Sequence, residues 1–333
     1  MLTLCLLLQA ATPPQAPPQL TSFLQQNIGF DAGQLAAVER GEAIVKVIEA
    51  RDRRDVVVFG IITVPVSRDQ WGNNARSFPA ALRTPNRTKV GVFSSPATES
   101  DVAAVVIPDR DVAEMKDCKP GNCVVKLPAT DMHRIHDDMN WSASPAELQA
   151  QLNAYARRRL VEYVTDYRAR GDSAMAIYDD RGNVNVHASE AFAAQLAESH
   201  YVFQTVPSLQ QYLANYPHAS LPGAAEVVFW SEDVMPRLRP ILSVTHQVVY
   251  TPPELPGMTL VTAKQIYANH YFEAALDLTA AVERAPASIY LVVLRRYRFD
   301  NLPGGILNIR GRAINALRDQ LVADLKRQQQ QPR

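Results

Sequence analysis

Residues 290–327, YLVVLRRYRFDNLPGGILNIRGRAINALRDQLVADLKR, join two different hydrophobic periodicities. The first part, within 289–299, is rich in β-branched and aromatic residues and predicts a strand. The last part, 308–326, predicts an amphipathic helix with charged residues on its outer side. Its inner side carries Ile314, Leu317, Leu321 and Leu325. The chain is therefore expected to close with a strand followed by one long amphipathic helix.

A second informative stretch, GEAIVKVIEARDRRDVVVFGIITVPVSRDQW, covers residues 41–71. It contains two strand-like runs, 43–50 and 55–66, separated by a charged turn at 51–54. The run within 55–66 is apolar on both of its alternating faces. This pattern predicts a strand that is covered on both sides.

The remaining patterned segments complete the expected order of elements. Helices are predicted at 20–39, 130–139 and 145–170, and antiparallel strands at 226–230, 241–250 and 260–278. The sequence thus predicts an α+β protein in which a curved antiparallel sheet wraps a long C-terminal helix, with a mostly helical insertion at about 94–219.

This order of elements resembles the helix-grip fold of the START-like (SRPBCC) superfamily. Residues 41–71 and 290–327 carry the resemblance. It implies a single domain over 20–327. The glutamine-rich composition of the C-terminus separately predicts a disordered tail at 328–333. The chain also resembles a set of exported bacterial proteins whose role is unknown.

In START-like proteins the space between sheet and helix is an apolar cavity for a lipid, sterol or polyketide-like ligand. The resemblance therefore implies a hydrophobic small molecule or lipid as the partner, bound for transport, sequestration or sensing. Geometry gives an independent reason, because a strongly curved sheet and a single helix cannot bring every inward side chain into contact. A fully packed core is the alternative.

Ionisable side chains interrupt the apolar faces of three neighbouring predicted strands. Side chains of a strand alternate between its two faces. By this alternation the apolar face carries His246 on one strand, His270 with Lys264 on the next, and Arg295 on the last. We expect these four side chains to form a polar patch in the cavity that orients a carboxylate or hydroxyl of the ligand. The alternatives are a bulge that turns them to solvent and an internal network of ion pairs.

Buried charges require partners, because their desolvation is costly. Glu232, Asp233 and Glu273 are candidate partners within the chain, and an anionic head group is a candidate from outside it. Three aromatic residues complete the predicted ligand-binding set, namely Tyr250, Phe272 and Tyr297.

An enzyme is the main alternative to a binding protein. Its acid/base residues would be His246, His270, Lys264 and Tyr267. The chain has neither a G-x-S-x-G elbow nor a glycine-rich nucleotide loop, which disfavours a standard serine hydrolase and a dehydrogenase. A scaffold protein in an envelope assembly is the second alternative, suggested by the helical middle of the chain.

Cys118 and Cys123 flank the turn sequence Lys-Pro-Gly-Asn. Such a turn brings its ends together, so we expect a structural disulfide in an oxidising compartment. A zinc site with His133 and His136 is disfavoured by the spacing. Those histidines lie in the polar segment 131–138, which fits a solvated helix end better than a general-base pair or metal ligands. No metal or cofactor is expected.

The first eleven residues, MLTLCLLLQAA, and the proline-rich segment that follows resemble a secretory signal within residues 1–19. We therefore expect a periplasmic or secreted protein.

The 34 basic residues equal the 34 acidic ones in number, and this balance of charge disfavours a nucleic-acid partner. Past the N-terminus, no apolar run approaches the roughly 20 residues of a membrane helix.

Overall fold

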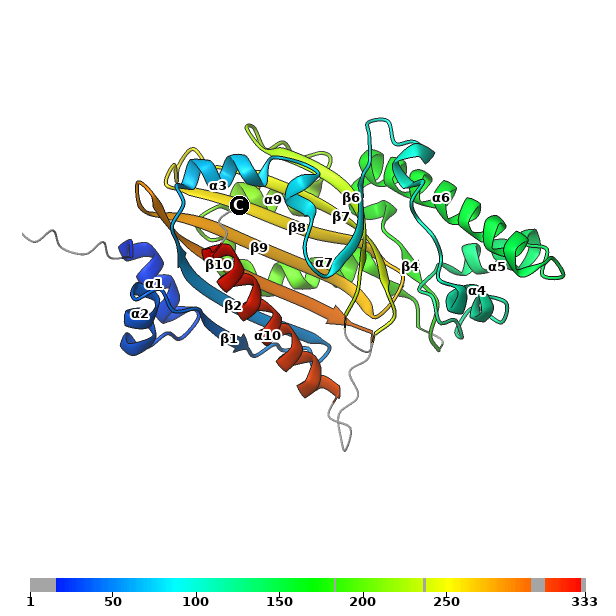
Figure 1. Cartoon of the computed structure of the whole chain (residues 1–333), viewed down its shortest axis with the longest axis horizontal. Helices are drawn as coiled ribbons and strands as arrows, with labels where there is room; N and C mark the ends of the chain where they lie inside the picture. The colour runs from blue at the N-terminus through cyan, green and yellow to red at the C-terminus, as the bar shows by residue number, and fades with distance from the viewer. Residues whose placement is uncertain (1–15, 183, 236–237, 301–308, 331–333) are drawn as a thin grey trace, which may run out of the picture.

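A curved antiparallel sheet of eight strands forms the centre of the molecule (Figure 1). The computed structural model describes residues 16–182, 184–235, 238–300 and 309–330. The strand order is β1-β2-β10-β9-β8-β7-β6-β3. The strands are β1 (Ile44–Ile48), β2 (Asp55–Val64), β3 (Arg87–Val92), β6 (Ala225–Asp233), β7 (Ile241–Tyr250), β8 (Met258–Ala268), β9 (Phe272–Ala285) and β10 (Ser288–Phe299). The predicted α+β class is confirmed.

One side of the sheet, called here the α10 face, is covered by the C-terminal helix α10 (Ile309–Gln330) and by α3 (Arg68–Ala75). Buried leucines of α10 pack on β2 at Gly60, where a Cβ would lie 2.8 Å from Leu325 Cδ1 and 3.0 Å from Leu321 Cδ2. The absence of a side chain at Gly60 thus allows the helix to approach the sheet. α10 reaches Gln330, so residues 328–330 continue the helix where a disordered tail was expected.

The opposite side, called here the insertion face, is covered by helices from the middle of the chain and by α1 (Pro18–Gln26) and α2 (Ala32–Glu39). The expected helical insertion is present. It contains α4 (Asp109–Met115), α5 (Ala129–Asp138), α6 (Pro145–Arg170), α7 (Ala188–Glu198), α8 (His200–Phe203) and α9 (Pro207–Asn215). Parts of α6, α7 and α9 pack on the sheet, whereas α4, α5 and the start of α6 form a separate small core at one end of it (Figure 1).

Helix α6 begins and ends where its sequence predicts. Ser144 accepts a hydrogen bond from Glu147 N at the N-terminus, and Pro145 occupies the first turn. Gly171 ends the helix with φ 58°. A Cβ at Gly171 would lie only 1.7 Å from the Tyr216 carbonyl oxygen, so this position requires glycine for packing as well as for conformation.

Two predicted elements are each divided in the structure. The expected strand 260–278 consists of β8 and β9, which are joined by a turn in which Tyr271 adopts φ 63°. The expected helix 20–39 consists of α1 and α2. The first difference matters most, because the direction of the chain reverses between Lys264 and Phe272.

Cys118 and Cys123 form the predicted disulfide, with Gly121 at φ 82° in the turn between them.

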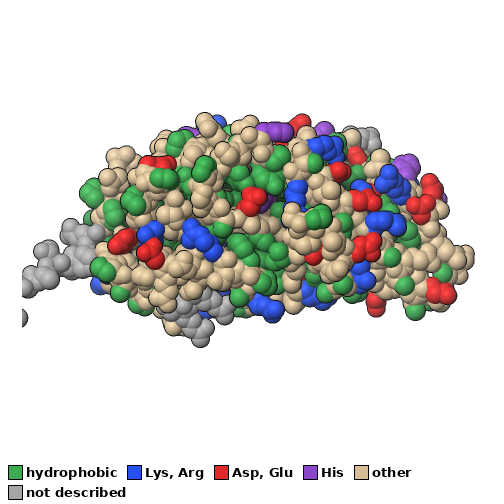
Figure 2. Space-filling view, turned by 90° about the horizontal axis from the view of Figure 1, so that it is seen from above, with side chains coloured by type: hydrophobic (Ala, Val, Ile, Leu, Met, Phe, Trp, Pro, Cys, Tyr) green, Lys and Arg blue, Asp and Glu red, His purple; other side chains and the backbone are tan. Residues whose placement is uncertain are grey.

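Among the described residues, no helix is both long and apolar enough to cross a bilayer. The face in Figure 2 carries acidic and basic side chains near one another, with apolar ones between them. Most of the expected signal segment, residues 1–15, lies outside the described residues.

Candidate functional site

His246 and Lys264 are cross-strand partners on β7 and β8, and both point to the insertion face. The expectation that these two side chains are buried among apolar neighbours is confirmed. The expectation that they share a cavity with Arg295 is wrong, because Arg295 of β10 lies on the α10 face.

His246 has a protein partner on each ring nitrogen. Nδ1 lies 3.0 Å from the Tyr167 hydroxyl of α6, and Nε2 lies 3.3 Å from Glu226 Oε2. Burial lowers the pKa of His246, against the neighbouring Glu226, which raises it. A neutral ring satisfies both contacts if Tyr167 donates to Nδ1 and Nε2 donates to Glu226. His246 therefore holds α6 to the sheet and has no nitrogen left for a ligand.

Lys264 is fully buried and plays a similar structural role. Its ammonium pairs with Asp172, donates to the Leu213 carbonyl oxygen at 3.1 Å, and lies 4.2 Å from the centre of the Phe192 ring. Burial lowers the pKa of Lys264, and Asp172 opposes that shift. These contacts join β8 to the end of α6, to α7 and to α9.

His270 lies in the turn between β8 and β9 and not on a strand face. Its Nδ1 is 3.0 Å from the Val124 carbonyl oxygen, and its Nε2 is 3.0 Å from Asp111 Oδ2 of α4. His270 thus fastens α4 and the disulfide loop to the end of the sheet. None of the three anticipated partners, Glu232, Asp233 and Glu273, contacts His246, Lys264 or His270 in the described residues.

Arg295 is the predicted site residue that lies beneath the C-terminal helix. Its Nη2 donates to Asp324 Oδ2 of α10 at 2.8 Å. Asp277 is its cross-strand neighbour on β9, and the Tyr297 hydroxyl donates to Asp277 Oδ2 at 3.0 Å. Asp277 and Asp324 were not predicted; finding them requires the β9–β10 register and the rotation of α10, neither of which periodicity supplies.

The Asp277 carboxyl is incompletely partnered. Its Oδ1 is buried and has no hydrogen-bond partner among the described residues. Burial raises the pKa of Asp277 above its usual value, while Arg295 and Tyr297 lower it by smaller amounts.

An open groove of about 480 Å³ runs between α10, α3 and the sheet, with Arg295 in its floor. The predicted internal cavity between the sheet and the C-terminal helix is not found in the described residues, because the leucines of α10 pack directly on β2; an open groove lies beside the helix instead. The large apolar side chains of its lining are those of Trp71, Val261, Leu291, Val293, Leu321 and Leu325. Gln247 and Thr279 add polar atoms to the floor.

The predicted aromatic residues are divided between the two faces of the sheet. Tyr250 is buried in the core of the insertion face. Phe272 and Tyr297 lie on the α10 face with ring centres 5.6 Å apart, next to the groove and not in its lining. Tyr250 therefore cannot contact a ligand in the groove.

The acid/base candidates of the alternative enzyme do not converge on one cavity. His246 and Lys264 are engaged under α6 and α7, and His270 holds α4. The Tyr267 hydroxyl donates to the Lys126 carbonyl oxygen at 3.2 Å. In segment 131–138, His136 Nδ1 lies 3.2 Å from Asp137 on the exposed side of α5. No cluster of three or more potential metal ligands occurs among the described residues.

Comparison of the chain with family models, with curated proteins and with solved structures finds no match.

We expect His246 to make the protein less stable in mild acid. Burial holds the native pKa of His246 below its usual 6.5, so the unfolded chain takes up a proton near pH 6.5 that the native protein does not. The free energy of unfolding should then fall as pH drops from 7.5 to 5.5, with His246 contributing at most about 1.4 kcal/mol per pH unit. Urea unfolding across this range measures the slope.

His246→Gln should flatten that slope relative to the wild type, whatever its effect at a single pH. His133→Gln is the matched control, because His133 is exposed on α5. Parallel slopes for wild type and His246→Gln would show that the buried ring does not titrate in this way.

Proposed function

We propose that this protein binds an amphiphilic small molecule with an anionic head group in the groove between α10 and the sheet. The apolar part of the ligand would lie along the leucine and valine walls, and its head group would contact Arg295. Transport, sequestration or sensing would each follow from such binding.

Arg295 carries the proposal. A guanidinium group has five N–H donors, and among the described residues Arg295 donates a hydrogen bond to Asp324 of α10. Arg295 lines the groove among both apolar and polar side chains, and its own side chain is 17 % exposed. Guanidinium groups bind carboxylates and phosphates through two parallel hydrogen bonds, which suits an oxyanion at this place.

The size and charge of the groove support the same class of ligand. Its volume of about 480 Å³ falls in the usual range for small-molecule sites. Three guanidinium groups line it, from Arg83, Arg295 and Arg327, against the single carboxylate of Asp324. This positive excess favours an anionic ligand over a cationic one.

Calorimetric titration with decanoate and 1-decanol tests the proposal, because the two probes share a chain and differ in charge. Wild-type protein should bind decanoate more tightly, since a charge-assisted hydrogen bond contributes about 1.5–3 kcal/mol, or roughly 10–100-fold in affinity. Arg295→Gln should remove that advantage and leave decanol binding within about threefold.

Arg318→Gln is the matched control, because Arg318 is exposed on α10 and does not line the groove. It should bind both probes as the wild type does. Retained decanol binding by Arg295→Gln shows that the variant is folded. Failure of the wild type to bind decanoate, or equal decanoate affinity in Arg295→Gln, would contradict the proposal.

We also propose that the chain is START-like and acts in the periplasm or outside the cell. A sheet that packs against a C-terminal helix, with a groove beside that helix, supports the first part. The Cys118–Cys123 bond supports the second, because disulfides persist mainly in oxidising compartments. Thiol labelling of protein taken from its host without reduction tests the location; two free thiols at these positions would contradict it.

A further inference from the structure

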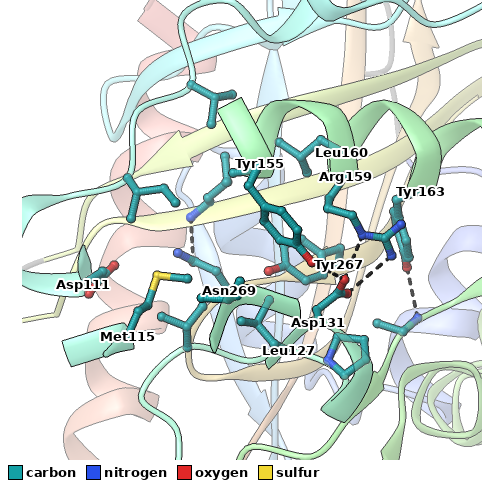
Figure 3. A pocket seen from close by; sticks show the side chains of 18 of the residues that line it. Asp111, Met115, Leu127, Asp131, Tyr155, Arg159, Leu160, Tyr163, Tyr267 and Asn269 are labelled. Atoms are coloured by element: carbon teal, nitrogen blue, oxygen red, sulfur yellow. Dashed lines mark hydrogen bonds and ion pairs between the residues drawn. The ribbon is translucent and has the colours of Figure 1, made fainter. Parts of the chain in front are cut away.

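A second cavity, called here the insertion pocket, lies between the helical insertion and the ends of strands β6 to β8 (Figure 3). Its volume is about 460 Å³. α4, α5 and α6 contribute to its walls together with the loops around 105–108, 125–128 and 174–177. Apolar residues dominate the lining, including Val105, Ile107, Met115, Leu127, Ile135 and Leu160. No residue of the groove beneath α10 lines this pocket, so the two cavities are separate.

One wall of the insertion pocket carries a cluster of paired polar side chains. Tyr155 and Arg159 project from successive turns of α6 toward Asp131 of α5 (Figure 3). The Tyr155 hydroxyl donates to Asp131 Oδ1 at 2.7 Å, and Arg159 Nε lies 2.8 Å from the same oxygen. Burial and the neighbouring Asp131 raise the pKa of Tyr155, so its hydroxyl keeps its proton.

The other ionised groups of the lining also have partners. These contacts are Asp111 with Arg239, Asp166 with Arg170, Glu232 with Lys89, and Asp179 with the Ala129 N–H. An ion that entered the pocket would lose its hydration without gaining an unpaired counter-charge. The lining therefore disfavours both anions and cations.

Asn269 supplies a neutral hydrogen-bond donor to the pocket. Its side chain is buried, with 7 % of the residue exposed, and it lines the pocket. Oδ1 accepts a hydrogen bond from Leu242 N at 2.8 Å, which fixes the amide so that Nδ2 is the free end. Within the described ranges, no hydrogen bond to Nδ2 is found. Nδ2 is therefore free to donate to an acceptor atom of a molecule in the pocket.

We propose that the insertion pocket is a second binding site, for an uncharged molecule with an apolar body and a carbonyl or hydroxyl oxygen. The oxygen accepts from Asn269 Nδ2, and the apolar body lies against the aliphatic and tyrosine side chains of the lining. This ligand class differs from the anionic one proposed for the groove, so the two sites are separable by charge.

Calorimetric titration with 4-phenylbutanamide, 4-phenylbutanoate and 4-phenylbutylamine tests the site, because the three probes share a body and differ in charge. The amide should bind at least about tenfold more tightly than either ion, because neither charge finds a partner. Equal or tighter binding of either ion would overturn the proposal.

Two variants locate the binding. Ala156 lies on the pocket side of α6. Ala156→Phe should lower the affinity for 4-phenylbutanamide at least about tenfold, because the larger side chain fills the cavity. Asn269→Asp keeps the oxygen that accepts from Leu242 N but loses the Nδ2 donor. This variant should lower the affinity for 4-phenylbutanamide about tenfold. Ala150→Phe is the control, since Ala150 is exposed on α6 and should leave the affinity unchanged. Unchanged amide affinity in Ala156→Phe would overturn the proposal.

Ala156→Phe should still bind decanoate, and Arg295→Gln should still bind 4-phenylbutanamide. These cross-checks separate the two sites, so failure of either proposal leaves the other open to its own test. Loss of amide binding in Arg295→Gln would place the amide in the groove and contradict a second site.

Discussion

Asp55→Asn will lower the free energy of unfolding by about 3–5 kcal/mol, the cost expected when one partner of a buried ion network is removed. Asp55 of β2 has no exposed surface. It accepts from Arg298 Nε at 2.7 Å and from Arg296 Nη1 at 3.1 Å, and both arginines are buried. Asparagine has nearly the same shape as aspartate, so the substitution creates no cavity. The decrease in the free energy of unfolding therefore measures the effect of removing the charge.

Urea denaturation of the wild type and the variant measures this effect. Glu198 and Asp52 also contact the two arginines, so the variant should still fold. Asp319→Asn is the control: Asp319 is exposed beside Arg318, and its removal should change stability by less than about 0.5 kcal/mol. A loss below about 1 kcal/mol for Asp55→Asn would mean that water or the other carboxylates replace it.

Leu321→Ala will have the second largest effect, a loss of about 2–5 kcal/mol. Leu321 of α10 is fully buried against β2, where its Cδ2 would lie 3.0 Å from a Cβ on Gly60. The truncation removes apolar contact and leaves a cavity at the centre of the helix–sheet interface. Thermal or urea unfolding provides the measurement.

Val184→Ala is a suitable comparison, since Val184 is 69 % exposed and its truncation should cost less than about 0.5 kcal/mol. If Leu321→Ala were equally mild, α10 would not be held on the sheet by its leucines. The α10 side of the groove would then need another explanation.

The terminal strand and helix were predictable from sequence because each has a clean periodicity. β10 and α10 end within a few residues of the predicted bounds. The turn between β8 and β9 was missed, because the run through Asn269, His270 and Tyr271 contains neither glycine nor proline. Tyr271 takes the positive φ there, which is rare for a bulky residue.

The candidate site was predictable only in part. The alternating pattern correctly identified the buried ionisable residues His246 and Lys264 and the half-buried Arg295, because a polar residue in an apolar series is visible without coordinates. Alternation does not show which elements cover each face. The insertion supplies Tyr167 and Asp172 to the first two residues, and α10 supplies Asp324 to the third. The insertion pocket was missed altogether, since Asp131, Tyr155 and Asn269 meet only through tertiary contacts.

The most direct test of ligand binding beneath α10 is a crystal structure of the protein with 10-bromodecanoate, located by the anomalous signal of bromine. We predict bromine between α10 and strands β8 to β10, with the carboxylate about 2.7–2.9 Å from the Arg295 guanidinium. Bromine in the insertion pocket only, or an empty groove at saturating ligand, would contradict the account.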